Sequence, residues 1–298
     1  MSGALLEPKL LRRLEQFQLL AARRAKSGTK GERRSRSRGQ SVEFADYRSY
    51  VAGDDLRYLD WNLFGRLDRL FLKLYEEERE LPVRIFLDAS ESMAFGEPRK
   101  FDLARQIAGA IGYVALCGFD RVSVVPFPEQ ARESASRAAL RSVRGRRSGL
   151  GFLQSLSQLE AAGHATLNEA LSRAALEARQ AGIAVVLSDF LDPAGYDSGL
   201  AALVSRGFQV HVVQILSPEE LTPTTFGDLK LVDSESGAIQ EVTFGKFRLK
   251  AYQQTVRNFI QRLKEYCQAR GVHFMSIPST EPLETLLLKQ LRETALWG

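Results

Sequence analysis

Apolar and polar residues follow two patterns along most of the chain, one typical of strands and one typical of helices. Short apolar runs predict strands, and segments with apolar positions three or four residues apart predict helices. The predicted strands are 82–87, 121–127, 183–187, 208–216 and 272–277, and the predicted helices are 98–117, 150–161, 167–181, 199–205, 246–269 and 284–294. This alternation predicts an α/β fold with a doubly wound, mostly parallel sheet and helices on both faces.

Two segments depart from this pattern. Residues 228–244 predict a hairpin with a Ser-Gly tip, which we interpret as an insertion into a sheet domain that spans 81–298. Residues 41–80 are rich in aromatic and acidic side chains, and a strand at 69–75 follows a Gly-Asp-Asp turn at 53–55. We therefore expect a strand-rich extension in front of the sheet domain.

Residues 1–40 combine a helix with a basic arm. Apolar residues such as Leu10 and Leu14 recur at helical spacing over 8–22. Residues 23–38 hold eight basic side chains and one acid, so this arm carries +7 of charge in a chain whose net charge is +5. The other 282 residues therefore carry −2. The arm has no aromatic residue, which predicts a flexible, solvated segment.

The composition is that of a folded protein, because 44% of the residues are hydrophobic and 26% are charged. Cys117 and Cys267 form neither a disulfide framework nor a CxxC metal site, which is typical of a reducing compartment. The most apolar stretch, 107–119, is shorter than the roughly 20 residues of a membrane-spanning helix, and the first residues lack the apolar core of a signal peptide. We expect a soluble, cytoplasmic protein.

A group of oxygen-bearing side chains follows the first predicted strand. Asp88 ends that strand, and Ser90 and Ser92 follow at spacings that let both hydroxyls turn toward the carboxylate. Ligands of doubly wound sheets bind outside the carboxyl ends of the strands, where two later loops contribute Thr166 and Asp189. Hard oxygen donors without sulfur or imidazole predict a site for Mg²⁺ or Mn²⁺ rather than Zn²⁺.

Each of these residues also has a simpler interpretation. Asp88 and the two serines can hydrogen-bond the backbone of the turn. Thr166 opens a T-x-x-E capping box with Glu169, and Asp189 can support the Asp-Pro turn at Asp192. The metal hypothesis is favoured because Asp88 ends the first strand of the sheet.

Two sequence patterns resemble known families. The D-x-S-x-S pattern at 88–92, with a later Thr and a strand-end Asp, resembles the metal-ion-dependent adhesion site of von Willebrand factor type A domains. The segment 48–61, RSYVAGDDLRYLDW, followed by the acidic run 76–78, resembles the bacterial family catalogued as Domain of Unknown Function 58. This resemblance covers about 31–190, and it departs at 64–66, where the family more often has a small residue and Ala before the Arg.

The resemblance implies a von Willebrand factor A-like domain that is not an enzyme and that acts as an adaptor or partner of a MoxR-type AAA+ ATPase. A carboxylate from the partner protein would complete the coordination of an ion held by this chain. The chain has no GxxxxGK[ST] motif, so nucleotide hydrolysis would belong to the partner. The implied metal ligands are Asp88, Ser90, Ser92, Thr166 and Asp189.

Two other functions fit parts of the sequence. A strand that ends in Asp88 is also typical of metal-dependent phosphatase-like hydrolases, but these place a general acid two residues on, where this chain has Ser90. The arm at 23–38 suggests nucleic-acid binding, yet it lacks interleaved aromatic residues for stacking. The arm and a second basic cluster also suit an acidic partner protein; that cluster comprises Arg141, Arg144, Arg146 and Arg147. We expect a non-enzymatic protein-protein interaction module.

Overall fold

The chain divides into two compact units, the body and the extension. The body comprises Met1–Ala25 and Leu81–Gly298, and the extension comprises Lys26–Glu80. The computed structural model describes residues 4–17, 19, 42–77, 81–128, 140–164, 166–223, 227–232, 239–244, 246–290 and 296. The predicted basic arm at 23–38 lies outside the described residues.

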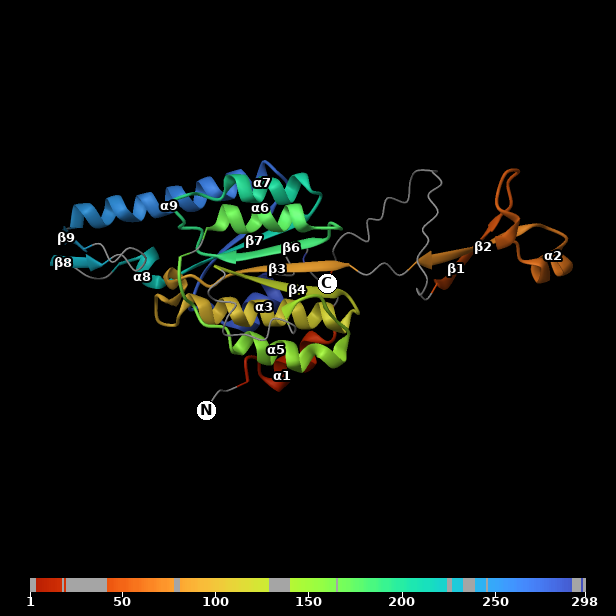
Figure 1. Cartoon of the computed structure of the whole chain (residues 1–298), viewed down its shortest axis with the longest axis horizontal. Coiled ribbons are helices and arrows are strands. Elements are labelled where there is room, and N and C mark those ends of the chain that lie inside the picture. The colour runs from red at the N-terminus through yellow and green to blue at the C-terminus, as the bar shows by residue number, and fades with distance from the viewer. Residues whose placement is uncertain are drawn as a thin grey trace. The chain divides into compact units, whose positions relative to one another are not determined.

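A six-stranded sheet forms the centre of the body (Figure 1). Its order is β10-β7-β6-β3-β4-β5, and only the short edge strand β5 runs antiparallel to its neighbour. The strands are β3 (Pro82–Asp88), β4 (Arg121–Phe127), β5 (Val143–Arg144), β6 (Ile183–Ser188), β7 (Gln209–Leu216) and β10 (His273–Pro278). The central strand β6 is buried along its whole length, as expected for a parallel strand covered on both faces. The predicted α/β class and mostly parallel sheet are confirmed.

Helices cover both faces of this sheet, and each face has its own hydrophobic cluster (Figure 1). One face is covered by α1 (Pro8–Leu14), α3 (Lys100–Cys117) and α5 (Gly149–Ser157). The other face is covered by α6 (Leu167–Glu177), α7 (Asp197–Ser205) and α9 (Lys246–Gln268).

The N-terminal helix α1 is shorter than the predicted 8–22. Leu10 and Leu14 lie in the hydrophobic cluster of the α3 face, so the helix is part of the body. Glu15 follows the helix, and its carboxylate accepts a hydrogen bond from the Tyr113 hydroxyl at 2.8 Å and pairs with Arg146 at 2.6 Å. These contacts fix the chain to α3 and to the turn at Arg146, directly after the helix ends at Leu14.

Three further elements differ from the predicted pattern or complete it. In the described part of the predicted helix 284–294, one α-helical turn, α10 (Leu283–Thr285), is followed by a π-helical turn over Leu286–Gln290, and residues 291–294 lie outside the described residues. A short helix that the periodicity does not predict, α8 (Pro218–Leu221), begins with a capping box between Ser217 and Glu220. At the predicted hairpin, β8 (Gly227–Val232) pairs antiparallel with β9 (Ile239–Phe244). The predicted Ser-Gly tip lies outside the described residues.

The extension contains a two-stranded antiparallel sheet of β1 (Val42–Ser49) and β2 (Phe71–Glu77). Between these strands the chain forms a 3₁₀ turn at Leu56–Tyr58 and a helix that the sequence did not predict, α2 (Trp61–Leu67). The carboxylate of Asp60 starts α2 by accepting the first free backbone N–H groups. In the described part of the chain, no helix is long and apolar enough to cross a membrane.

Candidate metal centre

Two neighbouring strands bring two buried carboxylates to one edge of the sheet. β3 ends at Asp88, and β6 is followed directly by Asp189. The two strands pair in parallel, so their carboxyl ends meet. Asp88 is 3% exposed and Asp189 is 2% exposed. Buried carboxylates need hydrogen-bond donors or cations around them.

A chain of hydrogen bonds joins four of the five predicted ligands. Asp88 Oδ1 accepts the backbone N–H of Ser90 at 3.0 Å and its hydroxyl at 2.7 Å. The Ser90 and Ser92 hydroxyl oxygens lie 3.0 Å apart, and Ser92 Oγ donates to Asp189 Oδ2 at 3.1 Å. The turn interpretation accounts for the Ser90 amide, whereas both hydroxyls are directed at side-chain oxygens.

Thr166 is the predicted ligand that this chain of hydrogen bonds does not include. Backbone hydrogen bonds from Ala162 to Ala89 and from Glu91 to Gly163 hold the preceding loop against the Asp88 loop. The Thr166 side chain itself is exposed. As a metal ligand, Thr166 stays a prediction.

The predicted capping box at Thr166 is wrong, because its side chain makes no cap hydrogen bond at the start of α6. The Asp192 carboxylate accepts the Leu167 N–H at 2.9 Å in its place, and it also accepts the Ala194 N–H of its own turn at 2.7 Å. Asp192 therefore supports the Asp-Pro turn. Asp189 also binds the backbone before this turn, because its Oδ1 accepts the Leu191 N–H at 2.9 Å, while its Oδ2 accepts the Ser92 hydroxyl.

Ser188 is a site residue that the sequence reasoning missed. Its hydroxyl donates to Asp88 Oδ2 at 2.6 Å and accepts the Phe190 N–H at 2.9 Å. Phe190 is buried and has a φ of 61°, a conformation that bulky residues rarely adopt. The signal in the sequence was a polar residue at the end of an otherwise apolar buried strand.

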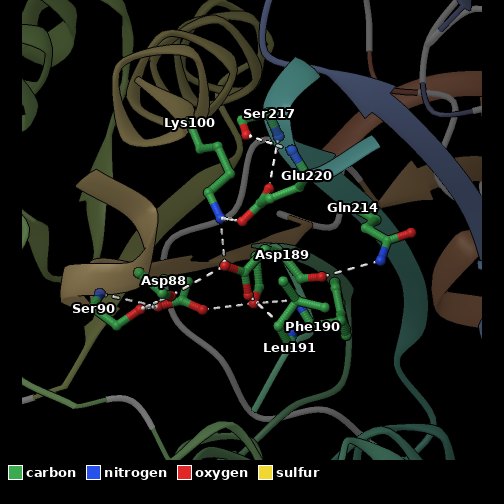
Figure 2. Close-up of polar contacts among 11 residues, drawn as sticks. Asp88, Ser90, Lys100, Asp189, Phe190, Leu191, Gln214, Ser217 and Glu220 are labelled. Atoms are coloured by element: carbon green, nitrogen blue, oxygen red, sulfur yellow. Dashed lines mark hydrogen bonds and ion pairs between the residues drawn. The ribbon is translucent and has the colours of Figure 1, made fainter. Parts of the chain in front are cut away.

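Lys100 is the second missed residue, and it lies at the centre of the polar cluster in Figure 2. It begins α3 and is fully buried. Its ammonium group donates to Asp189 Oδ2 at 2.7 Å and to Glu220 Oε1 at 2.6 Å. Only the fold brings Glu220 to this place, since α8 lies far along the chain from α3.

Glu220 is itself fixed by the capping box of α8. Its second carboxylate oxygen accepts the Ser217 N–H at 2.7 Å, and the Ser217 hydroxyl accepts the Glu220 N–H at 3.2 Å. Gln214 on β7 adds a further contact by donating to the Asp189 backbone oxygen at 3.0 Å. Gln214 thus contacts the Asp189 loop on the side away from Asp88, whereas Glu220 is connected to Asp189 through Lys100 (Figure 2).

Burial and neighbouring charges alter the acidity of these groups. Burial, with the charge of Asp189 adding to it, raises the pKa of Asp88 to about 7. Burial alone would lower the pKa of Lys100, but the charges of Asp189 and Glu220 outweigh it and the net direction is upward. Burial also raises the pKa of Glu220, although Lys100 opposes that shift. Asp88 is thus the carboxylate that lacks a cation of its own.

The donor set fits a hard divalent cation. Asp88, Asp189 and Glu220 against Lys100 leave a net charge of −2 when all four groups are ionised. Two carboxylates with two hydroxyls are oxygen ligands of the kind that Mg²⁺ and Mn²⁺ accept. No group of three or more His, Cys, Asp or Glu residues arranged to hold a metal occurs among the residues that the structure describes.

The sequence profile of the family described as "Protein of unknown function DUF58" matches residues 46–261. The chain belongs to this family. The match includes the segment 48–61, Asp88, Lys100 and Glu220.

Relatives of the chain occur in mycobacteria. The uncharacterized protein Rv1480 of Mycobacterium tuberculosis is 28% identical over 247 residues, which cover 80% of this chain and 75% of that protein. The uncharacterized protein Mb1516 of Mycobacterium bovis gives the same values.

Two solved structures resemble the chain more distantly. One is the conserved hypothetical protein BatB from Bacteroides thetaiotaomicron, with a TM-score of 0.41, and the other is an aerotolerance-related membrane protein from Bacteroides fragilis, with a TM-score of 0.42. Each is 16% identical to this chain, and each match covers 72% of this chain and 98% of the other. At these scores neither structure adds to the assignment of the fold.

Proposed function

We propose that the protein is a non-enzymatic interaction module that holds Mg²⁺ or Mn²⁺ at a site of the metal-ion-dependent adhesion type, in a von Willebrand factor A-like body. The observation that carries the proposal is the convergence of Asp88, Ser90, Ser92 and Asp189 at one strand edge. Thr166 is the fifth proposed ligand. A bound divalent cation supplies a positive centre to which a carboxylate of a partner protein binds.

The side chains around the ligands have distinct roles in this proposal. Ser188 orients Asp88 through the 2.6 Å hydrogen bond to Oδ2. Lys100 pairs with Asp189 Oδ2 at 2.7 Å, the same oxygen that accepts the Ser92 hydroxyl. Asp88 and Asp189 balance the charge of a divalent ion only when both bind it directly. When one of them binds through water, the ion keeps its affinity for an outside carboxylate.

The proposed partner is a protein that presents an Asp or Glu to this edge of the sheet. The resemblance to the Domain of Unknown Function 58 family suggests a MoxR-type AAA+ ATPase, with this chain acting as its adaptor in the cytoplasm. Binding to that partner is expected to require the metal.

Calorimetry with Mg²⁺ and with Mn²⁺ tests the metal site directly. We expect the wild-type chain to bind and Asp88→Ala to lose binding. Asp197→Asn is the matched control, because Asp197 is an exposed acid at the start of α7 and is expected to leave binding unchanged. A saturating ion, at about 100 times its Kd, should also stabilise the fold by about 2.7 kcal/mol. Equal heats for wild type and Asp88→Ala would disprove the metal site.

The same variants separate this proposal from a hydrolase. A metal-dependent hydrolase would turn over a generic phosphate ester, and Asp88→Asn would abolish that turnover. The interaction module is expected to show no turnover with either ion. Turnover that depends on Asp88 would replace the proposal with the hydrolase.

A further inference from the structure

Helix α9 concentrates positive charge in a body whose sequence is otherwise close to neutral. Its 23 residues include six basic side chains and one acid, a net charge of +5. The basic residues are Lys246, Arg248, Lys250, Arg257, Arg262 and Lys264. Charge of this density on one helix needs either neighbouring carboxylates or solvent.

Three of these cations form a line on the outer face of α9. Lys250, Arg257 and Lys264 are seven residues apart and all exposed. Seven residues of an α-helix complete two turns to within about 20°, so the three side chains lie on one face. Each step advances about 10.5 Å along the helix axis. We call these three residues the cationic stripe.

The cationic stripe has no carboxylate partner within the described parts of the chain. Arg257 donates to the amide oxygen of Gln254 at 3.1 Å. A hollow of about 400 Å³ lies beside the stripe and is lined by Thr255, Asn258, Gln261 and Arg262. The outer face of α9 thus presents three cations without a described carboxylate partner, next to this hollow.

The opposite face of α9 holds the helix firmly to the body. Leu263 and Cys267 are buried, and Tyr196 stacks edge-on against Phe259 and Tyr266. The N-terminal part of the helix continues past the end of the sheet on the side of α8 (Figure 1). This is the side to which the carboxyl ends of the parallel strands, and therefore Asp88 and Asp189, also point. A partner at that edge lies within reach of the cationic stripe.

We propose that the cationic stripe of α9 is a docking surface for an acidic protein segment with carboxylates spaced along it. The class of partner follows from the charge that would be complementary to the cationic stripe. Nucleic-acid interfaces commonly neutralise six to ten phosphates and add stacking aromatics, whereas this face offers three separated cations with neutral amides between them. The inference extends the proposed function, since both surfaces select carboxylates, but it does not depend on the metal.

The test uses the full chain and a fluorescent helical peptide of about 21 residues with Glu at every seventh position, so that its carboxylates match the stripe. A second peptide of the same composition has its Glu residues adjacent. Binding is measured by anisotropy at low ionic strength, where surface charge pairs are least screened. Each titration is run in Mg²⁺ and again in EDTA.

The decisive variant combines Lys250→Gln, Arg257→Gln and Lys264→Gln. Its control, Lys9→Gln with Arg12→Gln and Arg179→Gln, removes the same charge from exposed residues on α1 and after α6. We expect the α9 variant to bind the spaced peptide about tenfold more weakly, as three surface pairs of about 0.5 kcal/mol imply, while the control stays within about twofold of wild type.

The outcomes separate this inference from its rivals. Equal weakening by both variants, or no preference for the spaced peptide, would show that only net charge matters and would overturn the proposal. Binding of a DNA duplex that the α9 variant loses, without any response to the peptide, would assign the stripe to nucleic acid instead. Weakening that persists in EDTA supports the stripe even if calorimetry finds no metal site.

Discussion

At the scale of single residues, the candidate site depends on one buried cation. Lys100 contacts two carboxylates that belong to different elements, so its removal leaves both without a counter-charge. We expect Lys100→Met to destabilise the fold by about 3–5 kcal/mol in urea unfolding, the usual cost of breaking a buried ion pair from one side. Lys250→Met, which removes an exposed lysine, should change stability by less than about 0.5 kcal/mol.

The double variant Lys100→Met with Glu220→Gln tests whether charge or packing is responsible. It should recover part of the loss, because one of the two uncompensated carboxylates is removed. If the double variant is as unstable as Lys100→Met alone, the ion pair is not the cause.

Asp88 makes the stability of the metal-free protein dependent on pH. Its folded-state pKa of about 7 lies above the value of about 3.9 for an unfolded chain, so the folded state binds the proton more tightly. Stability should fall by roughly 2–4 kcal/mol as pH rises from about 4 to about 7, and level off above that. Urea unfolding in EDTA across this range measures the slope.

Two variants test whether Asp88 causes this pH dependence. Asp88→Asn should abolish the slope, whereas Glu91→Gln, which alters an exposed acid three residues away, should keep it. In the proposed site the ion binds the ionised carboxylate, so the stabilisation by Mg²⁺ is expected to grow over the same pH range. A slope that survives in Asp88→Asn would assign the titration to another group.

At the scale of elements, α3 and α5 pack so closely that Gly112 has no room for a side chain. A Cβ added at Gly112 would lie 2.3 Å from the Phe152 ring, whereas one added at Gly151 on α5 would meet nothing within 4 Å. Gly112→Ala should destabilise the body by about 1–3 kcal/mol through overpacking. Gly151→Ala should stabilise it by about 0.5–1 kcal/mol through helix propensity. Thermal unfolding of the two variants compares them, and equal effects would refute the packing explanation.

Helix α1 is expected to contribute to the stability of the body. Leu14 is fully buried in the hydrophobic cluster of the α3 face. Leu14→Ala should therefore cost about 2–5 kcal/mol of unfolding free energy. Leu150→Ala, at a site 74% exposed, should cost less than about 0.5 kcal/mol. A small effect at Leu14 would mean that the helix contributes little to the fold.

Five of the six strands of the sheet were predictable because each carries an apolar run, and β4 has the expected bounds of 121–127. The two-residue edge strand β5 was not predicted, since it has no such run. The D-x-S-x-S pattern was predictable because its residues are close in sequence. Lys100, Ser188 and Glu220 were not, since their roles arise from contacts across 89, 100 and 120 positions of the chain. Helix α2 was missed because its signal is a single capping Asp before a short aromatic segment.

At the scale of the whole molecule, the extension interrupts the body between α1 and β3. Residues of the body lie on both sides of it in the sequence, and each unit is compact. We expect a chain in which a Gly-Ser linker replaces residues 26–80 to fold, because a compact unit with its own core folds independently. Its body should also retain the response to Mg²⁺ in thermal unfolding. Loss of cooperative unfolding in this chain would show that the body needs the extension to fold.

Lys100 also affects whether the protein stays folded when metal is scarce. The ammonium group is built into the sequence, so Asp189 and Glu220 keep a partner at every metal concentration. Zinc-finger domains, in contrast, unfold when their ion is withdrawn. Under the proposed function, a cell depleted of magnesium would keep its folded chains, which are not substrates for the proteases that degrade unfolded protein, and would lose only the metal-dependent binding of the partner.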